Sequence, residues 1–494
     1  MRVTRRLQIR TLSQFATSLS AVALFLATIV LTCSQQANAI PAFARKYGLR
    51  CSACHESWPM LNYFGQKFKD NGYQLMNDRD APIWQNPGYW PVTFRMTPIW
   101  HRYSVGKELV DTYSAGSTTP TGSAVQRLTT SGFDLSGLDF HTGGTLEKNF
   151  SFYLLPSSDP TGAFHFETVM ARLDNLFGSP WLNVKLGKFE LDNLLSEKRI
   201  LTLTANGGIY QLYHFIPTGD GNIFGQMGDN QLGVEVLGHS YNDRTRYSAA
   251  ILSSNDGTTQ LPYGNAYTGF FTASQAFDTG RAGVQRIGFY AMVGEAPTTW
   301  LTQTGPSGST IIPGSGIGNK PFSREGFVGQ FYFGQHVDLT VITQHGEDNA
   351  WFGQGYGDFI DGIATANNTT GSTLPVGAQN PTWNGVLFEP HYVYSPQLIF
   401  IGRYETLRMS QQANGAGYTG VGPTGIIGPS PSNLGNLSTY TIGYRYNPFM
   451  TSRAGFAWHN EYNWLHQDGI GPSLGLTSAN LNTSELLLGF DFDF

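Results

Sequence analysis

The sequence predicts an all-β protein, a transmembrane antiparallel β-barrel of about sixteen strands that follows a short N-terminal α-helical segment. Three observations support this fold class. Charged residues make up 13% of the 494 residues and aromatic residues 14%, which is unusual for a soluble enzyme. From about residue 90, apolar and polar residues alternate with a period of two. The stretches that alternate are joined by short and long connections in turn, as in outer-membrane barrels.

Residues 1–39 predict a secretory signal peptide. Four arginines precede an apolar stretch from Leu19 to Leu31, and Ala37-Asn38-Ala39 supplies small residues for cleavage after Ala39. An uncleaved anchor is the alternative, but the apolar stretch is short for a membrane span. These residues hold four of the 30 Lys and Arg and none of the 35 Asp and Glu, so the remaining chain carries a net charge of −9. That charge disfavours nucleic acid as a partner.

Residues 40–88 predict a monohaem cytochrome c segment. Cys51-Ser52-Ala53-Cys54-His55 is a C-x-x-C-H motif, and its cysteines are the only two after the signal peptide. In such a motif the two thiols attach haem c covalently and the histidine is an axial ligand of the iron. A disulfide, a redox dithiol and a chance match are the alternatives. A redox dithiol of the thioredoxin type expects a βαβ setting, which this sequence does not predict.

The sequence does not identify the residue that would be the second axial ligand of the iron. Met76 and His101 are the candidates, and Met96 is a further one on the first predicted strand. Met60 is too near the motif to reach the distal face of the haem. For each candidate, ordinary packing is the alternative. The other histidines show no H-x-x-x-H or similar metal-ligand spacing.

A helix is expected directly after the motif. Ser57 is a possible cap and Pro59 suits the first turn. Leu61, Phe64 and Phe68 then fall on one face at helical spacing, and Asn71-Gly72 ends the helix. Residues 82–91 form an irregular connector.

Residues 89–494 predict an outer-membrane, porin-like barrel. In Leu437 to Tyr446 the aromatic and aliphatic side chains share one face, and Thr439, Thr441 and Arg445 lie on the other. Fourteen to eighteen strands fit the pattern, with both ends of the barrel in the periplasm. The chain ends on alternating apolar residues up to Phe494, as the last strands of outer-membrane barrels do. Tight turns are expected at 147–149, 178–180, 242–243, 278–280, 335–336, 395–397 and 447–449, and long connections at 105–131, 191–230, 296–322, 347–383 and 408–436.

The N-terminal segment resembles a known family. Ile40 to Gly48, Cys51 to His55, Leu61 to Phe68 and Asn71 to Tyr73 are similar to the fused outer-membrane monohaem cytochrome–porins, whose best-known members oxidise ferrous iron. The resemblance covers about residues 40–73 and over the barrel is one of architecture and length. It implies one covalent haem c on Cys51 and Cys54 with His55 as ligand. No iron-binding motif of the family can be matched here.

The resemblance also implies a function. We expect an electron conduit in the bacterial outer membrane, a possible ferrous-iron oxidase. It would pass electrons from extracellular Fe(II) to a periplasmic carrier such as a soluble cytochrome c or a copper protein. Acidic residues in one long loop would attract the cation: Glu347, Asp348, Asp358 and Asp361. The alternatives are electron export to an extracellular acceptor, and a solute porin whose haem-bearing segment is a plug.

Overall fold

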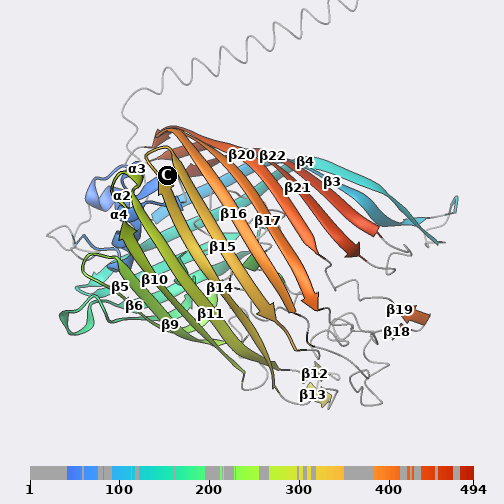
Figure 1. Ribbon diagram of the computed structural model, residues 1–494, viewed down its shortest axis with the longest axis horizontal. Helices are drawn as coiled ribbons and strands as arrows, with labels where there is room; N and C mark the ends of the chain where they lie inside the picture. Colours follow the sequence, from blue (N-terminus) through green and yellow to red (C-terminus); the bar gives the residue numbers. More distant parts are fainter. Residues whose placement is uncertain are drawn as a thin grey trace, which may run out of the picture.

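The protein is a closed antiparallel β-barrel of sixteen strands with a short helical segment at one end (Figure 1). The computed structural model describes residues 42–57, 60–75, 80, 82, 92–112, 114–116, 122–158, 162–194, 212, 213, 215, 227, 230–254, 266–297, 300–303, 309–312, 319–349, 380, 382–411, 420–422, 425–427, 436–450, 454–470 and 479–493. The expected signal peptide lies outside these residues. Among the described residues, no helix is long and apolar enough to cross a membrane.

The number of barrel strands confirms the sequence prediction. Each strand pairs with its neighbours along the chain, and the last strand pairs with the first, so the sheet has no open edge. The strands are β3 (Val92–Thr112), β4 (Gly122–Glu147), β5 (Phe150–Ser158), β6 (Phe164–Leu173), β7 (Asn183–Phe189), β8 (Gln231–His239), β9 (Thr245–Ser253), β10 (Tyr267–Asp278), β11 (Val284–Pro297), β14 (Asn319–Phe333), β15 (Val337–Glu347), β16 (Thr382–Ser395), β17 (Leu398–Gln411), β20 (Leu437–Met450), β21 (Gly455–Ile470) and β22 (Ala479–Asp493). Two small hairpins, β12 (Trp300–Gln303) with β13 (Ser309–Ile312) and β18 (Gly420–Gly422) with β19 (Gly425–Ile427), lie outside the barrel sheet.

Connections are short at one end of the barrel and mostly long at the other, as predicted, although 159–163 between β5 and β6 is a short connection at the long-loop end. The start of β3 and the end of β22 both lie at the short-turn end. Six of the seven tight turns fall where the sequence places them. The seventh is wrong, because 447–449 lies inside β20 at a break in register, and the chain turns after Met450. The predicted long connection 105–131 is also wrong in extent, since β3 and β4 continue as a paired hairpin to Thr112 and Gly122. That hairpin is longer than the nine to eleven residues, roughly, that span a bilayer.

The outer surface of the barrel is apolar. On β20, Tyr440, Ile442 and Tyr446 are exposed, while Thr439 and Arg445 are completely buried on the inner face. The same alternation exposes large apolar side chains on the other strands, among them Phe271, Phe289, Phe327, Phe400 and Leu488. A closed barrel with an apolar outer band is the architecture of a bacterial outer-membrane protein. The chain is therefore an outer-membrane barrel.

The inside of the barrel contains a hydrophobic core. Inward side chains such as Phe270, Ile342 and Trp383 pack with Leu212 and Phe215, which precede β8 and fold into the lumen. The ring of Phe215 lies edge-on to Trp383 at 5.4 Å, and Gln344 Nε2 donates to the carbonyl of Leu212 at 3.0 Å. The lumen of a general porin is polar and filled with water. Here one side of the lumen is packed like the interior of a soluble domain.

The N-terminal segment forms α2 (Ala42–Tyr47), α3 (Cys51–Cys54), α4 (Tyr63–Asp70) and a small sheet of β1 (His55–Ser57) and β2 (Met60–Leu61). These elements lie at the short-turn end of the barrel (Figure 1). The predicted helix is therefore shorter than expected. Its cap is Asn62, whose Oδ1 accepts from the N–H of Gly65 at 2.9 Å, because Ser57 is used in β1. The helix ends as predicted, with Gly72 at a positive φ of 72°.

Candidate functional site

The C-x-x-C-H motif lies at the short-turn mouth of the barrel. Cys51 to Cys54 form the single turn of α3, and the N–H of His55 donates to the carbonyl of Cys51. Helix α4 packs directly on this turn: a Cβ added to Gly65 would lie 2.1 Å from the carbonyl oxygen of Cys54. Glycine at this position is thus required for the close approach of α3 and α4.

No disulfide joins Cys51 and Cys54. Burial, followed by the nearby carboxylate of Asp493, raises the pKa of Cys51 to about 12. Burial also raises the pKa of Cys54 to about 11. A redox dithiol needs a thiolate and therefore a lowered pKa. The protein environment of these thiols does the opposite, which disfavours the redox-dithiol interpretation.

A glycine of the barrel wall faces Cys51. The inward position opposite this thiol is Gly455, where an added Cβ would have Asp493 Oδ2 at 3.8 Å and Cys51 Sγ at 4.0 Å as its nearest neighbours. Cys51 is itself buried, so its sulfur faces the wall and not the surrounding water. On the far side of the motif, Tyr63 and Phe64 of α4 are 50% and 41% exposed. A buried thiol that faces a wall position without a side chain fits attachment of a haem.

Helix α4 is held to the barrel by buried ion pairs. Lys69 Nζ lies 3.3 Å from Glu190 Oε2 and 3.2 Å from Asp192 Oδ1. Burial would lower the pKa of Lys69, but Asp192 and Glu190 outweigh it and raise that pKa above its ordinary value of 10.5. Asp70 Oδ2 lies 2.9 Å from Arg246 Nε on β9. These contacts fix the helix inside the mouth.

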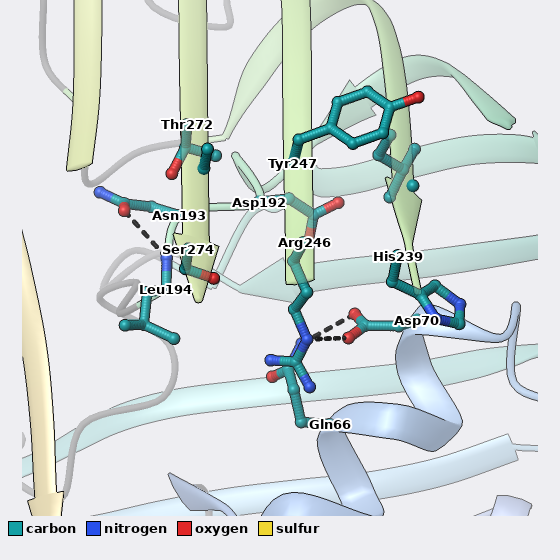
Figure 2. Close-up of a pocket in the computed structure, with 13 residues that line it drawn as sticks. Gln66, Asp70, Asp192, Asn193, Leu194, His239, Arg246, Tyr247, Thr272 and Ser274 are labelled. Atoms are coloured by element: carbon teal, nitrogen blue, oxygen red, sulfur yellow. Dashed lines mark hydrogen bonds and ion pairs between the residues drawn. The ribbon is translucent and has the colours of Figure 1, made fainter. Parts of the chain in front are cut away.

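The end of α4 makes further contacts with the wall. Arg172 of β6 donates from Nη1 to the carbonyl of Lys69 at 3.0 Å, and it also donates to the carbonyl of Asp70. Figure 2 shows Asp70 between Arg246 and His239, beside a cavity of about 30 Å³ that Gln66 also lines. A polar cavity of this size has room for one or two waters. These contacts place the N-terminal segment at the barrel mouth, and the expected position of a haem there stays a prediction.

An aromatic cluster joins the segment to the barrel. Phe43 stacks on Tyr73 with ring centroids 4.8 Å apart, and Tyr73 stacks on Tyr153 of β5 at 5.9 Å. Phe68 packs edge-on to both Phe43 and Tyr47. The predicted helix face of Leu61, Phe64 and Phe68 is thus wrong in part, because Phe68 is buried here while Phe64 points outward. The buried positions of α4 are Gly65, Phe68 and Asp70.

The candidates for the second axial ligand fall in different places. Met76 lies outside the described residues. His101 is on the inner face of β3, where its Nε2 lies 2.6 Å from Glu485 Oε1. It is six residues beyond Arg95, which pairs with Asp493 beside Cys51, so the strand rise separates them by about 20 Å. At that distance His101 cannot coordinate an iron held at the motif, and we do not assign it.

The positions of Met96 and Met60 show how each of them packs. Met96 pairs with Leu138 and Phe492 on the outer face of the barrel, which excludes it as a ligand inside the lumen. Met60 is buried against Ile399 and Ile401 on the inner wall of β17. Among the residues that the structure describes, no three His, Cys, Asp or Glu come together to hold a metal ion.

The four acidic residues that were expected to attract a cation also differ in their surroundings. Asp348 is buried, and its Oδ1 lies 2.6 Å from Arg324 Nη2, so it is part of an internal ion pair. The Oε1 of Glu347 accepts from Asn380 at 2.7 Å. Asp358 and Asp361 lie outside the described residues. Asp348 is therefore a structural residue and not a surface ligand for a cation.

Comparisons with known proteins give the fold alone. No protein-family model and no curated protein matches this sequence. Solved structures of similar fold include the outer membrane channel DcaP of Acinetobacter baumannii, at 10% identity and a TM-score of 0.46 over 82% of this chain and 97% of that one. The anion-selective porin from Comamonas acidovorans is 12% identical, with a TM-score of 0.43 over 81% and 99% of the two chains. OmpT of Vibrio cholerae is 10% identical, with a TM-score of 0.42 over 82% and 98%.

Proposed function

We propose that the protein is an outer-membrane electron conduit whose short-turn mouth is closed by a segment carrying one covalent haem c. The observation that carries this proposal is the position of the C-x-x-C-H motif. The Cys51 thiol faces the inner barrel wall at Gly455, inside a segment docked by buried ion pairs. Cys51 and Cys54 would hold the haem and His55 would ligate its iron. When bound, the haem supplies a one-electron redox centre.

The residues of the chain supply the surroundings of that centre. The barrel excludes lipid, and the inner core of Leu212, Phe215 and Trp383 restricts water inside the lumen. Low water content around a redox centre changes its potential and lowers the cost of reorganisation on electron transfer. The exposed rings of Tyr63 and Phe64 lie on the side of the short turns, where a periplasmic carrier would approach. Extracellular ferrous iron is the proposed donor, by the family resemblance alone, and a soluble cytochrome c or a copper protein the proposed acceptor. Electron export in the reverse direction would use the same path.

A second candidate is a solute porin in which the haem-bearing segment is a plug. The sixteen-stranded barrel favours it, since this is the architecture of porins. The inner wall of β20 to β22 is also rich in buried polar side chains, among them Arg445, Glu461 and Asp491. The two candidates differ in what crosses the barrel, and conductance separates them.

The test of the proposed function has two stages. A haem-stained denaturing gel should show one covalent haem that is lost in the Cys51→Ala, Cys54→Ala double variant. A stained band that persists in the double variant would end the haem assignment. In sealed, correctly oriented outer-membrane vesicles, ferrous iron added outside should then reduce the haem within minutes. If dithionite reduces the haem and ferrous iron does not, iron is not the donor. The proposal of an electron conduit with another donor would then still stand.

A further inference from the structure

The small β1–β2 sheet that carries His55 is attached to the inner wall of the barrel at two points. Its second strand begins at Met60, which is buried in a cluster with Ile401 of β17. Its first strand contains Glu56, whose Oε1 accepts from the hydroxyl of Tyr332 on β14 at 3.2 Å. The histidine of the C-x-x-C-H motif is therefore followed directly by a side chain that is bonded to the wall.

The two points of attachment belong to one row of residues across the barrel wall. Tyr332 pairs with Asp338 on β15, which pairs with His391 on β16. His391 in turn pairs with Ile401. Because neighbouring strands are about 4.8 Å apart, this row of four residues is about 14 Å long. A hydrogen bond at Tyr332 and apolar packing at Ile401 thus hold the β1–β2 sheet at the two ends of the row.

The backbone of Tyr332 is itself fixed by a side chain of β11, the neighbouring strand. Gln285 Oε1 accepts from the N–H of Tyr332 at 2.6 Å, and Gln285 Nε2 donates to its carbonyl at 2.9 Å. The carboxylate of Asp338, the next residue of the row, is bonded to His391, with Oδ1 and Nδ1 2.7 Å apart. Tyr332 therefore presents its hydroxyl to Glu56 from a position that the sheet and Gln285 define.

We propose that Tyr332 is a positioning residue for His55, the axial ligand of the proposed haem, and that it acts through Glu56. Rotation of the backbone at His55 also moves Glu56, so a bond that holds Glu56 to the wall restricts the directions in which the imidazole can point. Residues that do not touch the metal orient its ligands in this way and thereby tune the metal centre. This inference rests on the proposed function, and it gives the barrel wall a part in fixing the haem ligand.

The test uses the haem-loaded full-length protein. Tyr332→Phe removes only the hydroxyl, and Glu56→Ala removes the acceptor. Both variants should shift and broaden the low-field feature in the electron paramagnetic resonance spectrum of the ferric haem, because its g values depend on the orientation of the axial ligand. Glu56→Gln keeps an oxygen that can accept from Tyr332, so it should give the wild-type spectrum.

Tyr290→Phe is the matched control, because it removes the hydroxyl of another inward tyrosine of the barrel. That hydroxyl lies 3.0 Å from the carbonyl oxygen of Thr343 and 3.2 Å from Gln344 Oε1, both on β15. The control should leave the spectrum unchanged. A change as large as that in Tyr332→Phe would mean that the spectrum reports general loosening of the barrel, and it would overturn the inference.

The double variant Tyr332→Phe, Glu56→Ala should change the spectrum no more than Glu56→Ala does, since both substitutions remove the same bond. Effects that add fully would show that the two residues act independently and would overturn the inference. So would an unchanged spectrum in both single variants, or a Glu56→Gln spectrum like that of Glu56→Ala. In all these outcomes the covalent haem is present and the proposed function stands. Absence of the covalent haem from wild type would instead overturn the proposed function, and this inference with it.

Discussion

At the residue scale, the chemistry of the motif can be read from the sequence but its surroundings cannot. Cys51, Cys54 and His55 are recognisable from spacing alone. Nothing near them in the chain indicates that Gly455 faces Cys51, because only the folded barrel brings these two residues together. For the same reason His101 was a reasonable candidate from sequence, and only the strand register shows its distance from the motif.

Gly65→Ala is expected to destabilise the docked segment. Alanine normally favours a helix interior by about 1 kcal/mol over glycine. At Gly65 the added methyl would lie 2.1 Å from the backbone carbonyl of Cys54, so α3 and α4 must move apart. Overpacking of this kind costs about 1–3 kcal/mol. Thermal unfolding followed at the haem band should show the loss.

Gly132→Ala is the control for that substitution, since no atom lies within 4 Å of its added Cβ. It should leave the transition temperature unchanged. A Gly65→Ala variant at least as stable as wild type would show that α3 and α4 are not packed as described.

At the element scale, sequence patterns predicted the strands better than the helix. Alternation with a period of two gives both the position of a strand and its faces, as on β20, where the predicted outer and inner residues are correct. The helix was placed from capping and spacing within a short segment. Its boundaries instead depend on the β1–β2 pairing and on barrel partners such as Arg172 and Arg246, which are distant in sequence.

Lys69→Met should loosen helix α4 from the barrel. The ammonium of Lys69 is the shared partner of Glu190 and Asp192, and its loss leaves buried carboxylates with fewer cations. Breaking a buried ion pair from one side costs about 3–5 kcal/mol. Limited proteolysis of the folded protein should release a haem-bearing peptide faster than from wild type.

Lys67→Met is the matched control, because Lys67 lies on the same helix and no ion pair to it is described. It should be cleaved at the wild-type rate. Equal cleavage of the Lys69→Met variant would mean that the ion pairs do not hold the segment.

The docking of α4 should also depend on pH. The pKa of Lys69 is raised, so its contribution is complete below the ordinary value of 10.5 and is lost as pH rises through the higher value. The pKa of Asp192 is lowered: burial opposes this, but Lys185 and Lys69 outweigh it. Its contribution is complete above the ordinary 3.8 and is lost as pH falls through the lower value.

The part of the resistance to proteolysis that Lys69 and Asp192 supply should therefore be constant from about pH 5 to 9 and fall only at the extremes, since their shifted pKa values lie outside the ordinary ones. Burial raises the pKa of Asp70, and its contribution has the opposite sense, because it is lost as pH rises from the ordinary 3.8 through the raised value. The pH dependence of this resistance can be measured with acid- and base-tolerant proteases, or by hydrogen exchange of α4. In an Asp70→Asn background, a release midpoint near neutral pH would contradict Lys69 and Asp192 as the residues that fasten the segment.

At the scale of the whole molecule, closure and strand number were predictable, and the content of the lumen was not. The even number of strands and the alternation of short and long connections both follow from the positions of the turns along the chain. In the inner core, Leu212 and Phe215 come from a connection between β7 and β8 whose sequence shows no regular period, so this connection could not be distinguished from an ordinary external loop.

This core predicts that the barrel conducts ions poorly. Trp383 is completely buried inside the lumen, where it packs on Phe215 and lies beneath the guanidinium of Arg324, 4.4 Å from its ring. Purified protein in a planar bilayer should thus show a much lower conductance than a water-filled porin of sixteen strands. Trp383→Ala removes the largest buried ring, at a cost of about 3–5 kcal/mol. It should raise the conductance in the same measurement. Trp458→Ala, which removes a ring 45% exposed on the outer face of β21, should not. A wild-type conductance equal to that of open porins would favour the solute porin over the electron conduit, because an open lumen cannot also exclude water from the haem.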